Sequence, residues 1–239
     1  MVHDLTRLEQ GLKSWDMDIS KNQLLKFDRY ISLLIEWNNK MNLTTILDPD
    51  DIIVDHFLDS LSILKIMDIE DSSIIDVGTG AGFPGIPIKI MKPETNLLLL
   101  DSLKKRTEFL KVVTGELNLH NIDIIHSRAE DLARKQDYRE GFDLAVSRAV
   151  ASLNVLSEYC IPFVKAGGYF ISYKGPAAEG ELIRAKKAIK ELGGQSQPQI
   201  KNIPVPFSPK THKLVLIQKN TATPKKYPRS PGKVKKSPL

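Results

Sequence analysis

The sequence lacks the features of a secreted or membrane-embedded protein. It has one cysteine, Cys160, in 239 residues, which excludes an internal disulfide and any metal site built from several cysteines. No apolar run approaches the length that spans a bilayer. The opening "MVHDLTRLEQGLKSW" mixes acids and bases and has no apolar core of a secretory signal. These absences predict a cytoplasmic protein without a membrane partner.

Acidic residues are missing from the end of the chain. Residues 210–239 hold eight lysines, one arginine and no acid, a charge of +9, which leaves −4 for residues 1–209 because the whole chain carries +5. A basic segment of this kind either improves solubility or contacts a polyanion, usually nucleic acid. Residues 220–239 are also rich in Pro, Lys and Ser, so we expect them to form a basic tail that stays extended and mobile until it binds a partner.

Two kinds of pattern divide the rest of the chain. Residues 1–70 predict a helical region, with apolar residues at helical spacing and plausible starts at Ser20 and at Asp48-Pro49. Residues 71–219 alternate short β-rich runs with amphipathic stretches, which indicates an α/β domain with a mostly parallel sheet covered on both faces. The runs that we expect to be strands are 73–77, 97–100, 122–126, 142–146, 168–173 and 214–218.

A glycine-rich loop follows the first predicted strand, in "IIDVGTGAGFPGIPI". The G-x-G-x-x-G that it contains is a weak sign of a dinucleotide site. Asp76 would place a carboxylate close to a bound pyrophosphate, and Pro84 offers no N–H to one. S-adenosylmethionine carries a sulfonium and an ammonium, so the acid favours this cofactor over a nicotinamide dinucleotide. A strand-to-helix turn without a ligand is the remaining alternative.

The ends of the next two strands add acids that suit adenosine. Asp101 ends the second strand, and its two acceptor oxygens match two ribose hydroxyls. Ala129 and Glu130 follow the third strand and are placed to flank the adenine. Each acid also has a structural explanation, as a helix cap or as a carboxylate in the first turn of a helix.

The chain lacks two features that known methyltransferases use to activate their acceptors. After the fourth strand it reads Ser147-Arg148-Ala149 instead of the Asn/Asp-Pro-Pro-aromatic stretch of enzymes that methylate exocyclic amines. Methylation of a pyrimidine carbon needs a cysteine nucleophile, and Cys160 is placed for core packing in a helix. Guanine N7 needs neither device, so positioning and charge stabilisation suffice, and Arg148 is the candidate catalytic residue. Arg148 could instead bind the cofactor carboxylate or form a surface ion pair.

Several stretches together resemble a known family. They are "WNNKMNLTTI", "DHFLDSL", "IDVGTGAGFPGIPI", "LLDSLKKRTEFL", "NIDIIHSRAEDL", "DLAVSRAVASLNVL" and "KKYPRSPGKVKKSPL". In this order they are similar to the 16S ribosomal RNA guanine-N7 methyltransferase family, also called glucose-inhibited division protein B. The resemblance runs from about residue 33 to the end of the chain.

The resemblance implies a fold, a cofactor and a set of site residues. The fold would be the class I methyltransferase (Rossmann-like) fold, a doubly wound, mostly parallel seven-stranded sheet with an N-terminal helical extension. The reaction would transfer a methyl group from S-adenosylmethionine to N7 of a guanine in 16S ribosomal RNA, with the small ribosomal subunit as partner and no metal. The cofactor-binding residues would be Gly78, Gly80, Phe83, Asp101, Ala129, Glu130 and Arg148.

Basic residues near the strand ends and in the tail are candidates for contact with RNA. They are Lys104, Arg106, Arg128, Lys174, Lys225, Lys226 and Arg229. Asn42, Thr44, His56 and Asp59 are further polar candidates, although His56 and Asp59 could equally hold their helix to the sheet. We expect a monomer. Two alternatives remain: a nicotinamide-dependent oxidoreductase, and a ribosome-binding protein that has lost catalysis.

Overall fold

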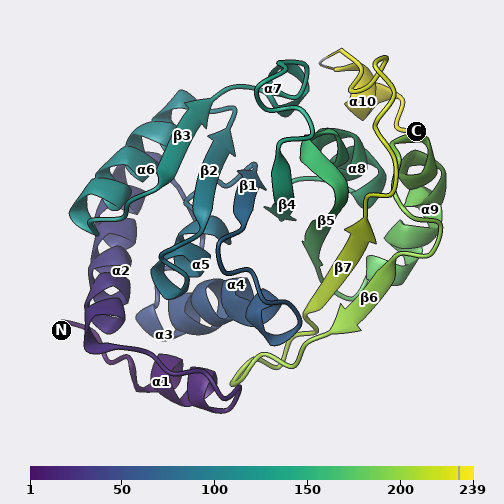
Figure 1. Cartoon of the computed structure of the whole chain (residues 1–239). Coiled ribbons are helices and arrows are strands. Elements are labelled where there is room, and N and C mark those ends of the chain that lie inside the picture. Colours follow the sequence, from purple (N-terminus) through teal and green to yellow (C-terminus); the bar gives the residue numbers. More distant parts are fainter. Residues whose placement is uncertain (231) are drawn as a thin grey trace.

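The structure, a computed structural model, contains one seven-stranded sheet with the order β3-β2-β1-β4-β5-β7-β6 (Figure 1). It describes residues 1–230 and 232–239; Pro231, which falls in the predicted tail, lies outside the described residues. The strands are β1 (Ser73–Val77), β2 (Asn96–Asp101), β3 (Ile122–His126), β4 (Phe142–Arg148), β5 (Val164–Lys174), β6 (Gln199–Asn202) and β7 (Lys213–Gln218). β1 to β5 pair in parallel, whereas β7 pairs antiparallel with both β5 and β6.

Helices precede the sheet and alternate with its strands. The N-terminal helices are α1 (Thr6–Lys13), α2 (Lys21–Met41), α3 (Pro49–Asp51), the π-helix η1 (Ile52–Leu58), α4 (Asp59–Leu61) and the 3-10 helix η2 (Ser62–Lys65). Those that follow β1 are α5 (Gly85–Met91), α6 (Lys104–Glu116), α7 (Ala129–Leu132), α8 (Leu153–Cys160), η3 (Ile161–Phe163), α9 (Ala178–Glu191) and α10 (Lys233–Lys236).

Helices cover both faces of the sheet. Successive strand residues point to opposite sides and are therefore buried in two different cores. On β1, Ile74 belongs to the core that includes α2, α5 and α6, whereas Ile75 belongs to the core that includes α8 and α9. This arrangement is a doubly wound sheet of the class I methyltransferase type, as the sequence predicts. It brings the carboxyl ends of β1 to β5 to one edge of the molecule, where such sheets bind ligands.

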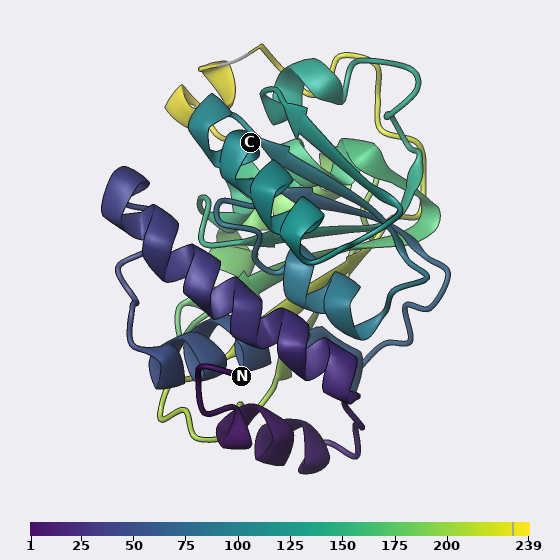
Figure 2. The ribbon, with the colours of Figure 1, turned by 90° about the vertical axis from the view of Figure 1, so that its left-hand side faces the viewer.

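The N-terminal helices extend the layer on one face of the sheet (Figure 2). α2 begins with a capping box, in which Ser20 accepts a hydrogen bond from the Gln23 amide and Gln23 reaches back to the Ser20 amide. Asp48 caps α3, with Pro49 as its first residue. The Tyr30 hydroxyl, buried on α2, donates to the carbonyl of Ala81 and so ties this layer to the glycine loop.

The structure contains all six predicted strands and one more, β6. β6 is a short edge strand with one partly buried and three exposed residues, so it has no apolar run that periodicity could detect. Cys160 is fully buried in a core cluster, as expected. The π-helix from Ile52 to Leu58 was not expected, since a shift from i+4 to i+5 hydrogen bonding leaves no mark in apolar spacing.

The described residues of the C-terminal tail, 220–230 and 232–239, pack against the domain, which differs from the extended segment expected from composition (Figure 1). Arg229 forms a bidentate ion pair with Glu158 on α8, at 2.6 to 3.0 Å, and Glu158 is fully buried. Tyr227 and Val234 are buried in the core cluster of α8 and α9. Composition pointed to disorder because lysine and proline dominate the tail, but these few anchors hold it in place.

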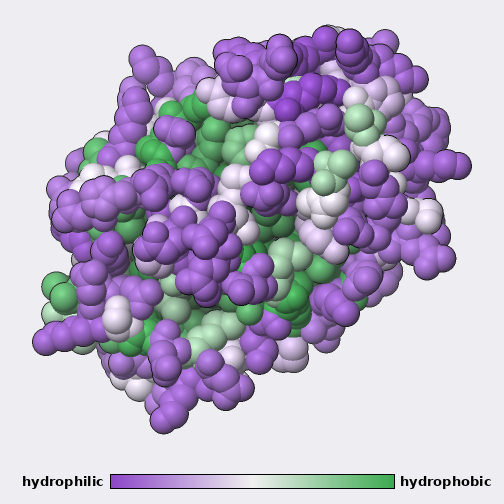
Figure 3. Space-filling view, viewed as in Figure 1, coloured by the Kyte–Doolittle hydropathy of each residue, from purple (hydrophilic) through white to green (hydrophobic). Residues whose placement is uncertain are grey.

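Hydrophilic residues cover most of the face seen in Figure 3, and hydrophobic residues show mainly toward its middle. Across the described residues, none of the helices is both long enough and apolar enough to cross a membrane.

Candidate functional site: a cofactor cavity beside an arginine network

The glycine loop between β1 and α5 uses its own amides. Gly78 and Thr79 donate to the Leu100 carbonyl, Gly82 and Phe83 donate to the Thr79 carbonyl, and Gly80 donates to Asp101. Pro84 has no N–H, and the Gly85 amide at the start of α5 donates to Asp76. A pyrophosphate in a dinucleotide site needs such amides to be free. The loop is therefore poorly suited to a phosphate group.

Asp76 does not face the ligand cavity, which corrects the electrostatic argument drawn from the sequence. Its side chain is fully buried, and one carboxyl oxygen accepts hydrogen bonds from Thr79 (2.7 Å) and the Gly85 amide (2.9 Å). The other oxygen has no partner in the described part of the chain. Burial raises the pKa of Asp76 to about 7. Asp76 therefore shapes the loop and caps α5, and does not supply the charge of the cleft.

A cavity of about 100 Å³ lies at the carboxyl ends of β1, β2 and β3. It brings together Gly78, Asp101, Arg128, Ala129 and Glu130, which were singled out from three separate strand ends. Asp101 and Glu130 are almost fully buried there, and the lining balances these two acids with the bases Arg128 and Lys235. The cavity also has three walls that the sequence did not indicate: Val150, Tyr159 and Lys235.

Asp101 is fixed by the loop and by the following helix. Its Oδ2 accepts from the Gly80 amide at 2.9 Å, and its Oδ1 accepts from the Leu103 amide at 2.8 Å. Arg106 reaches Oδ2 at the longer distance of 3.4 Å. Since a carboxylate offers about four acceptor positions, Asp101 retains capacity for a hydroxyl on Oδ1, and a second on Oδ2 if Arg106 moves.

The cavity is narrow because two side chains lean into it. Gly78 has a φ of 73°, and a Cβ built on it would lie 2.5 Å from a methyl of Val150. Lys235 enters from the folded tail. Sites for cofactor-sized ligands enclose about 300–1,000 Å³, so this cavity holds only part of such a ligand. The local sequence does not predict that either residue lines the cavity, because Val150 lies in a loop and Lys235 lies 85 positions further along the chain.

Arg148, at the end of β4, is the centre of a second cluster. One of its terminal nitrogens donates to Asp59 at 2.8 Å and to the Asp55 carbonyl at 3.0 Å, and the other lies 3.1 Å from Nδ1 of His56. Its guanidinium also lies 5.0 Å from the centre of the Phe83 ring. His56 and Asp59 thus hold η1 and α4 to the sheet through Arg148, the structural role considered for them from the sequence.

The protonation of this cluster follows from its contacts. Burial, reinforced by the charge of Arg148, lowers the pKa of His56 to about 3, so the ring is neutral. Arginine can only donate, so Nδ1 of His56 is the acceptor and Nε2 carries the proton that faces Thr44, 3.0 Å away. Burial alone would raise the pKa of Asp59, but hydrogen bonds from His212 and Arg148 hold it below its ordinary value.

A larger cavity, of about 740 Å³, opens beside this cluster. Its walls include Arg148 and Ala149 at the end of β4, Tyr173 and Pro176 at the end of β5, and Lys210 and His212 just before β7. Arg148 therefore lines this wider cavity and not the narrow one, whereas Gly80 and Phe83 line neither, and Phe83 packs against the Arg148 guanidinium. Of the residues expected at the cofactor, Gly78, Asp101, Ala129 and Glu130 line the narrow cavity.

The candidate RNA residues occupy different environments. Lys104, Arg128, Lys225 and Lys226 are exposed. Arg106 is paired with Asp101, and Lys174 is paired with Glu181 at 2.8 Å with 10% of its side chain exposed. Arg229 is held by Glu158 in the tail anchor. These four have no acidic partner in the described part of the chain, although Arg128 also lines the narrow cavity, whereas the other three already hold acidic partners.

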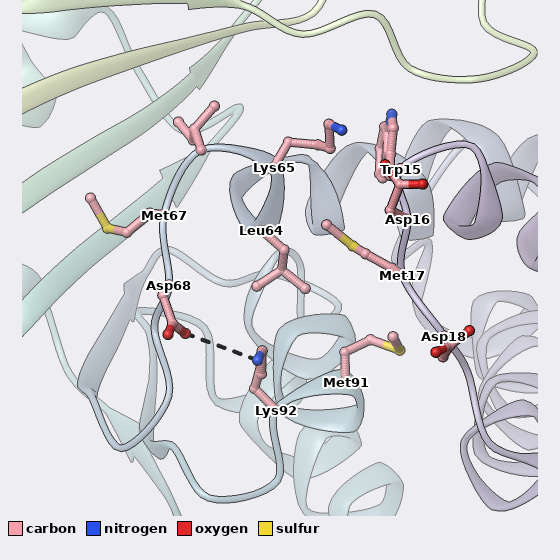
Figure 4. Close-up of a pocket in the computed structure, with 11 residues that line it drawn as sticks. Trp15, Asp16, Met17, Asp18, Leu64, Lys65, Met67, Asp68, Met91 and Lys92 are labelled. Atoms are coloured by element: carbon pink, nitrogen blue, oxygen red, sulfur yellow. Dashed lines mark ion pairs between the residues drawn. The ribbon is translucent and has the colours of Figure 1, made fainter.

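A further cavity, of about 600 Å³, lies away from these residues (Figure 4). It is lined by the segment after α1, the segment before β1, and the end of α5, where Lys92 pairs with Asp68. These segments lie at the amino ends of the strands, opposite the glycine loop. Among the described residues no group of three or more His, Cys, Asp or Glu side chains is arranged to hold a metal ion.

The fold and the cavity define a class of protein. A mostly parallel sheet of seven strands in this order, with a cleft at the glycine loop after β1, is the class I methyltransferase fold. Solved structures share it: a Haloferax volcanii methyltransferase in complex with the Trm112 activator (TM-score 0.57, 12% identity, 79% of this chain and 98% of that one). Another is M. jannaschii TYW2 in complex with AdoMet (TM-score 0.50, 12% identity, 85% of this chain and 78% of that one).

The chain belongs to the family described as rRNA small subunit methyltransferase G, whose model matches residues 23–203. It is 50% identical over 233 residues to ribosomal RNA small subunit methyltransferase G of Alkaliphilus oremlandii, with 97% of each chain covered. It is 52% identical over 228 residues to the protein of the same name from Clostridium kluyveri, with 95% of each chain covered.

Proposed function

We propose that this protein transfers a methyl group from S-adenosylmethionine to N7 of a guanine in the RNA of the small ribosomal subunit. One observation carries the proposal: in a chain of this family, Gly78, Asp101, Ala129 and Glu130 converge on one cavity at the carboxyl ends of three strands.

The residues of this cavity fit the adenosine end of the cofactor. Asp101 has acceptor capacity for ribose hydroxyls, and the Ala129-Glu130 step lies on the same wall, where an adenine edge can be read. The loop amides are used internally, which disfavours a pyrophosphate, so a nicotinamide-dependent oxidoreductase is not favoured. S-adenosylmethionine supplies an electrophilic methyl group when it is bound. The chain's contribution is to orient it and to present the acceptor.

The choice of acceptor follows from the groups near the transfer site. Cys160 is buried in the core, and burial raises the pKa of its thiol well above the usual value, so it cannot serve as the nucleophile of carbon methylation. Guanine N7 carries an in-plane lone pair and needs no deprotonation. Arg148 is held rigidly enough to position the acceptor and stabilise charge.

The partner is RNA of the small subunit, contacted through the exposed residues Lys104, Arg128, Lys225 and Lys226. We propose that the protein acts as a monomer in the cytoplasm, without a membrane partner. A non-catalytic ribosome-binding role would need no cofactor, yet the cavity retains its adenosine-type acids.

The test uses labelled S-adenosylmethionine with small subunits and with RNA stripped of protein. The RNA is digested to nucleosides, and the labelled product is identified by mass spectrometry. We expect 7-methylguanosine. Transfer to another position would refute the acceptor, and binding of the cofactor without any transfer would favour the non-catalytic role.

A further inference from the structure

We propose that the C-terminal tail is a wall of the cofactor site, in which Lys235 faces the bound adenosine and Arg229 positions Lys235. This inference rests on the proposed function and adds to the site a segment that lies outside the strand ends.

Lys235 is the residue of the tail that lines the narrow cavity, together with the buried acids Asp101 and Glu130. Its side chain makes no ion pair in the described part of the chain, whereas the other cation that reaches inward from the tail, Arg229, is taken by Glu158. An unpaired ammonium and two buried carboxylates therefore line one cavity, and the ammonium keeps its donors for a ligand.

The charges of the lining suit different parts of an adenosine. An ionised carboxylate can only accept, so Asp101 and Glu130 serve the hydroxyl and amino donors of the ligand. The ring nitrogens N3 and N7 of adenine are acceptors, which neither acid can serve. An ammonium only donates, and the methylene stem of a lysine covers apolar surface while its head stays polar. Lys235 therefore offers the adenine ring a donor and a cover that the two acids lack.

Two anchors place Lys235 at the cavity. Its neighbour Val234 is fully buried in the core cluster of α8 and α9, and α10 packs on α8. Arg229 forms the second anchor: Nε and Nη2 donate to the buried Glu158 at 2.6 to 3.0 Å, and Nη1 donates to the Ser237 carbonyl at 2.8 Å. Ser237 follows the last residue of α10, so one guanidinium ties α8 to the end of the helix that carries Lys235.

The same guanidinium acts on a second wall of the cavity. Tyr159, which lines the cavity, follows Glu158 directly on α8. Arg229 thus contacts the residue before one wall and the end of the helix that carries another. Its loss should disturb the position of Lys235 relative to Tyr159, and not only the stability of the tail.

Backbone contacts fix the path of the tail before Arg229. Arg134 donates to the Pro228 carbonyl at 2.6 Å, and Arg139 donates to the carbonyls of Thr223 and Tyr227 at 2.7 and 2.9 Å. Because these contacts are made to the main chain, they hold the chain itself and not one side chain. A segment held in this way can form a permanent part of a binding site.

Calorimetric binding of S-adenosylhomocysteine tests the role of Lys235. Lys235→Ala removes the donor and the stem, Lys235→Arg keeps both in altered form, and Lys236→Ala is the matched control on a neighbouring exposed lysine that does not line the cavity. We expect Lys235→Ala to weaken binding about tenfold, the loss of one hydrogen bond from a charged donor. Lys235→Arg should recover most of this loss, and Lys236→Ala should bind as wild type does.

Acetylation of lysines gives a second result that is independent of activity. The full-length protein is acetylated briefly with and without S-adenosylhomocysteine, and the modification of Lys235 and Lys236 is compared by mass spectrometry. We expect the ligand to protect Lys235 and to leave Lys236 unchanged, because only the first lines the cavity. Equal binding by Lys235→Ala and Lys236→Ala, or equal protection of the two lysines, would overturn the inference.

A double-mutant cycle tests the positioning role of Arg229. Arg229→Lys keeps the charge but loses the planar fork that joins Glu158 to Ser237. If Arg229 acts through Lys235, Lys235→Ala should weaken S-adenosylhomocysteine binding much less in the Arg229→Lys background than in wild type. An undiminished effect in that background would overturn the role of Arg229.

The proposed function fails in a different way. A wild-type protein that binds S-adenosylhomocysteine but methylates no RNA would refute methyl transfer alone, and the binding results would still decide the role of Lys235. A wild-type protein that binds neither S-adenosylmethionine nor S-adenosylhomocysteine would refute both proposals.

Discussion

Arg148 donates a hydrogen bond to Nδ1 of His56 across 3.1 Å and thereby fixes the neutral ring with its proton on Nε2. The contact joins the end of β4 to a π-helix that belongs to the N-terminal layer. It ties the N-terminal helices to the end of β4, because they determine where the Arg148 guanidinium lies. The neutral His56 ring accepts from Arg148 and the ionised Asp59 pairs with it, so the charged guanidinium is held in one position.

His56→Ala should loosen Arg148 while leaving the narrow cavity intact. We expect methyl transfer to fall about 10- to 100-fold, because the donors of Arg148 lose their fixed direction. His56→Asn offers an acceptor close to the position of Nδ1 and should recover part of the rate. The readout is kcat and KM for small subunits over pH 6 to 9. A parallel loss in both variants, explained by a lower melting temperature alone, would show that His56 only stabilises the fold.

We also expect the free energy of unfolding to depend on pH through His56. Its pKa is about 3 in the folded state against 6.5 for the ordinary group, so between these values the unfolded chain binds a proton that the folded chain does not. The contribution of a neutral His56 is therefore complete above pH 6.5 and is lost as the pH falls toward 3. Urea unfolding at pH 7.5 and 5 should show a smaller decline in His56→Asn than in wild type. An equal decline in both would contradict the assignment.

Asp76 predicts the opposite dependence. Burial raises its pKa to about 7 from 3.8, so between these values the folded state binds the extra proton, and stability from this group falls as the pH rises through that range. Asp76→Asn keeps an acceptor for Thr79 and the Gly85 amide and cannot ionise. We expect its free energy of unfolding to lack this component between pH 5 and 8, measured in the same urea series. A variant with the slope of wild type would show that Asp76 does not titrate there.

The glycine loop offers a matched pair of substitutions. Gly78 and Gly80 both have positive φ, 73° and 62°, but an added Cβ meets Val150 at 2.5 Å only at Gly78. Alanine in the left-handed region costs about 1–2 kcal/mol at either site. We expect Gly78→Ala to weaken S-adenosylmethionine binding more than Gly80→Ala, because it also displaces the wall of the cavity. Calorimetric titration of both variants decides this, and equal losses would mean that backbone strain alone is responsible.

Arg229 should act on stability and Lys225 on RNA. Removing one partner of a buried ion pair costs about 3–5 kcal/mol, so Arg229→Ala should lower the free energy of unfolding by roughly this amount.

Lys225→Ala leaves stability unchanged and should reduce the salt dependence of RNA binding by about one phosphate contact. Lys186→Ala, on the exposed face of α9, is the control for RNA binding. If Arg229→Ala weakened RNA binding with no loss of stability, the anchor assignment would be wrong.

Sequence patterns predicted the sheet well because strand burial is a local property. "NLLLLD" has no polar alternation, and the structure buries Leu97 and Leu98 in opposite cores. The ends of β1, β2 and β3 also follow from sequence, since parallel strands bring their carboxyl ends together. Asp76 was misjudged because position along the strand does not tell whether a carboxylate faces the cleft or the loop. The Arg148 network joins residues from 55 to 212, and no local pattern reports such long-range contacts.

Equilibrium binding of two cofactors tests the central claim most directly. S-adenosylmethionine and NAD are titrated separately into the wild-type protein in a calorimeter, and each titration is repeated with Glu130→Gln. The account predicts saturable one-to-one binding of S-adenosylmethionine that weakens in the variant, and no heat from NAD. Tight binding of NAD with no binding of S-adenosylmethionine would contradict it.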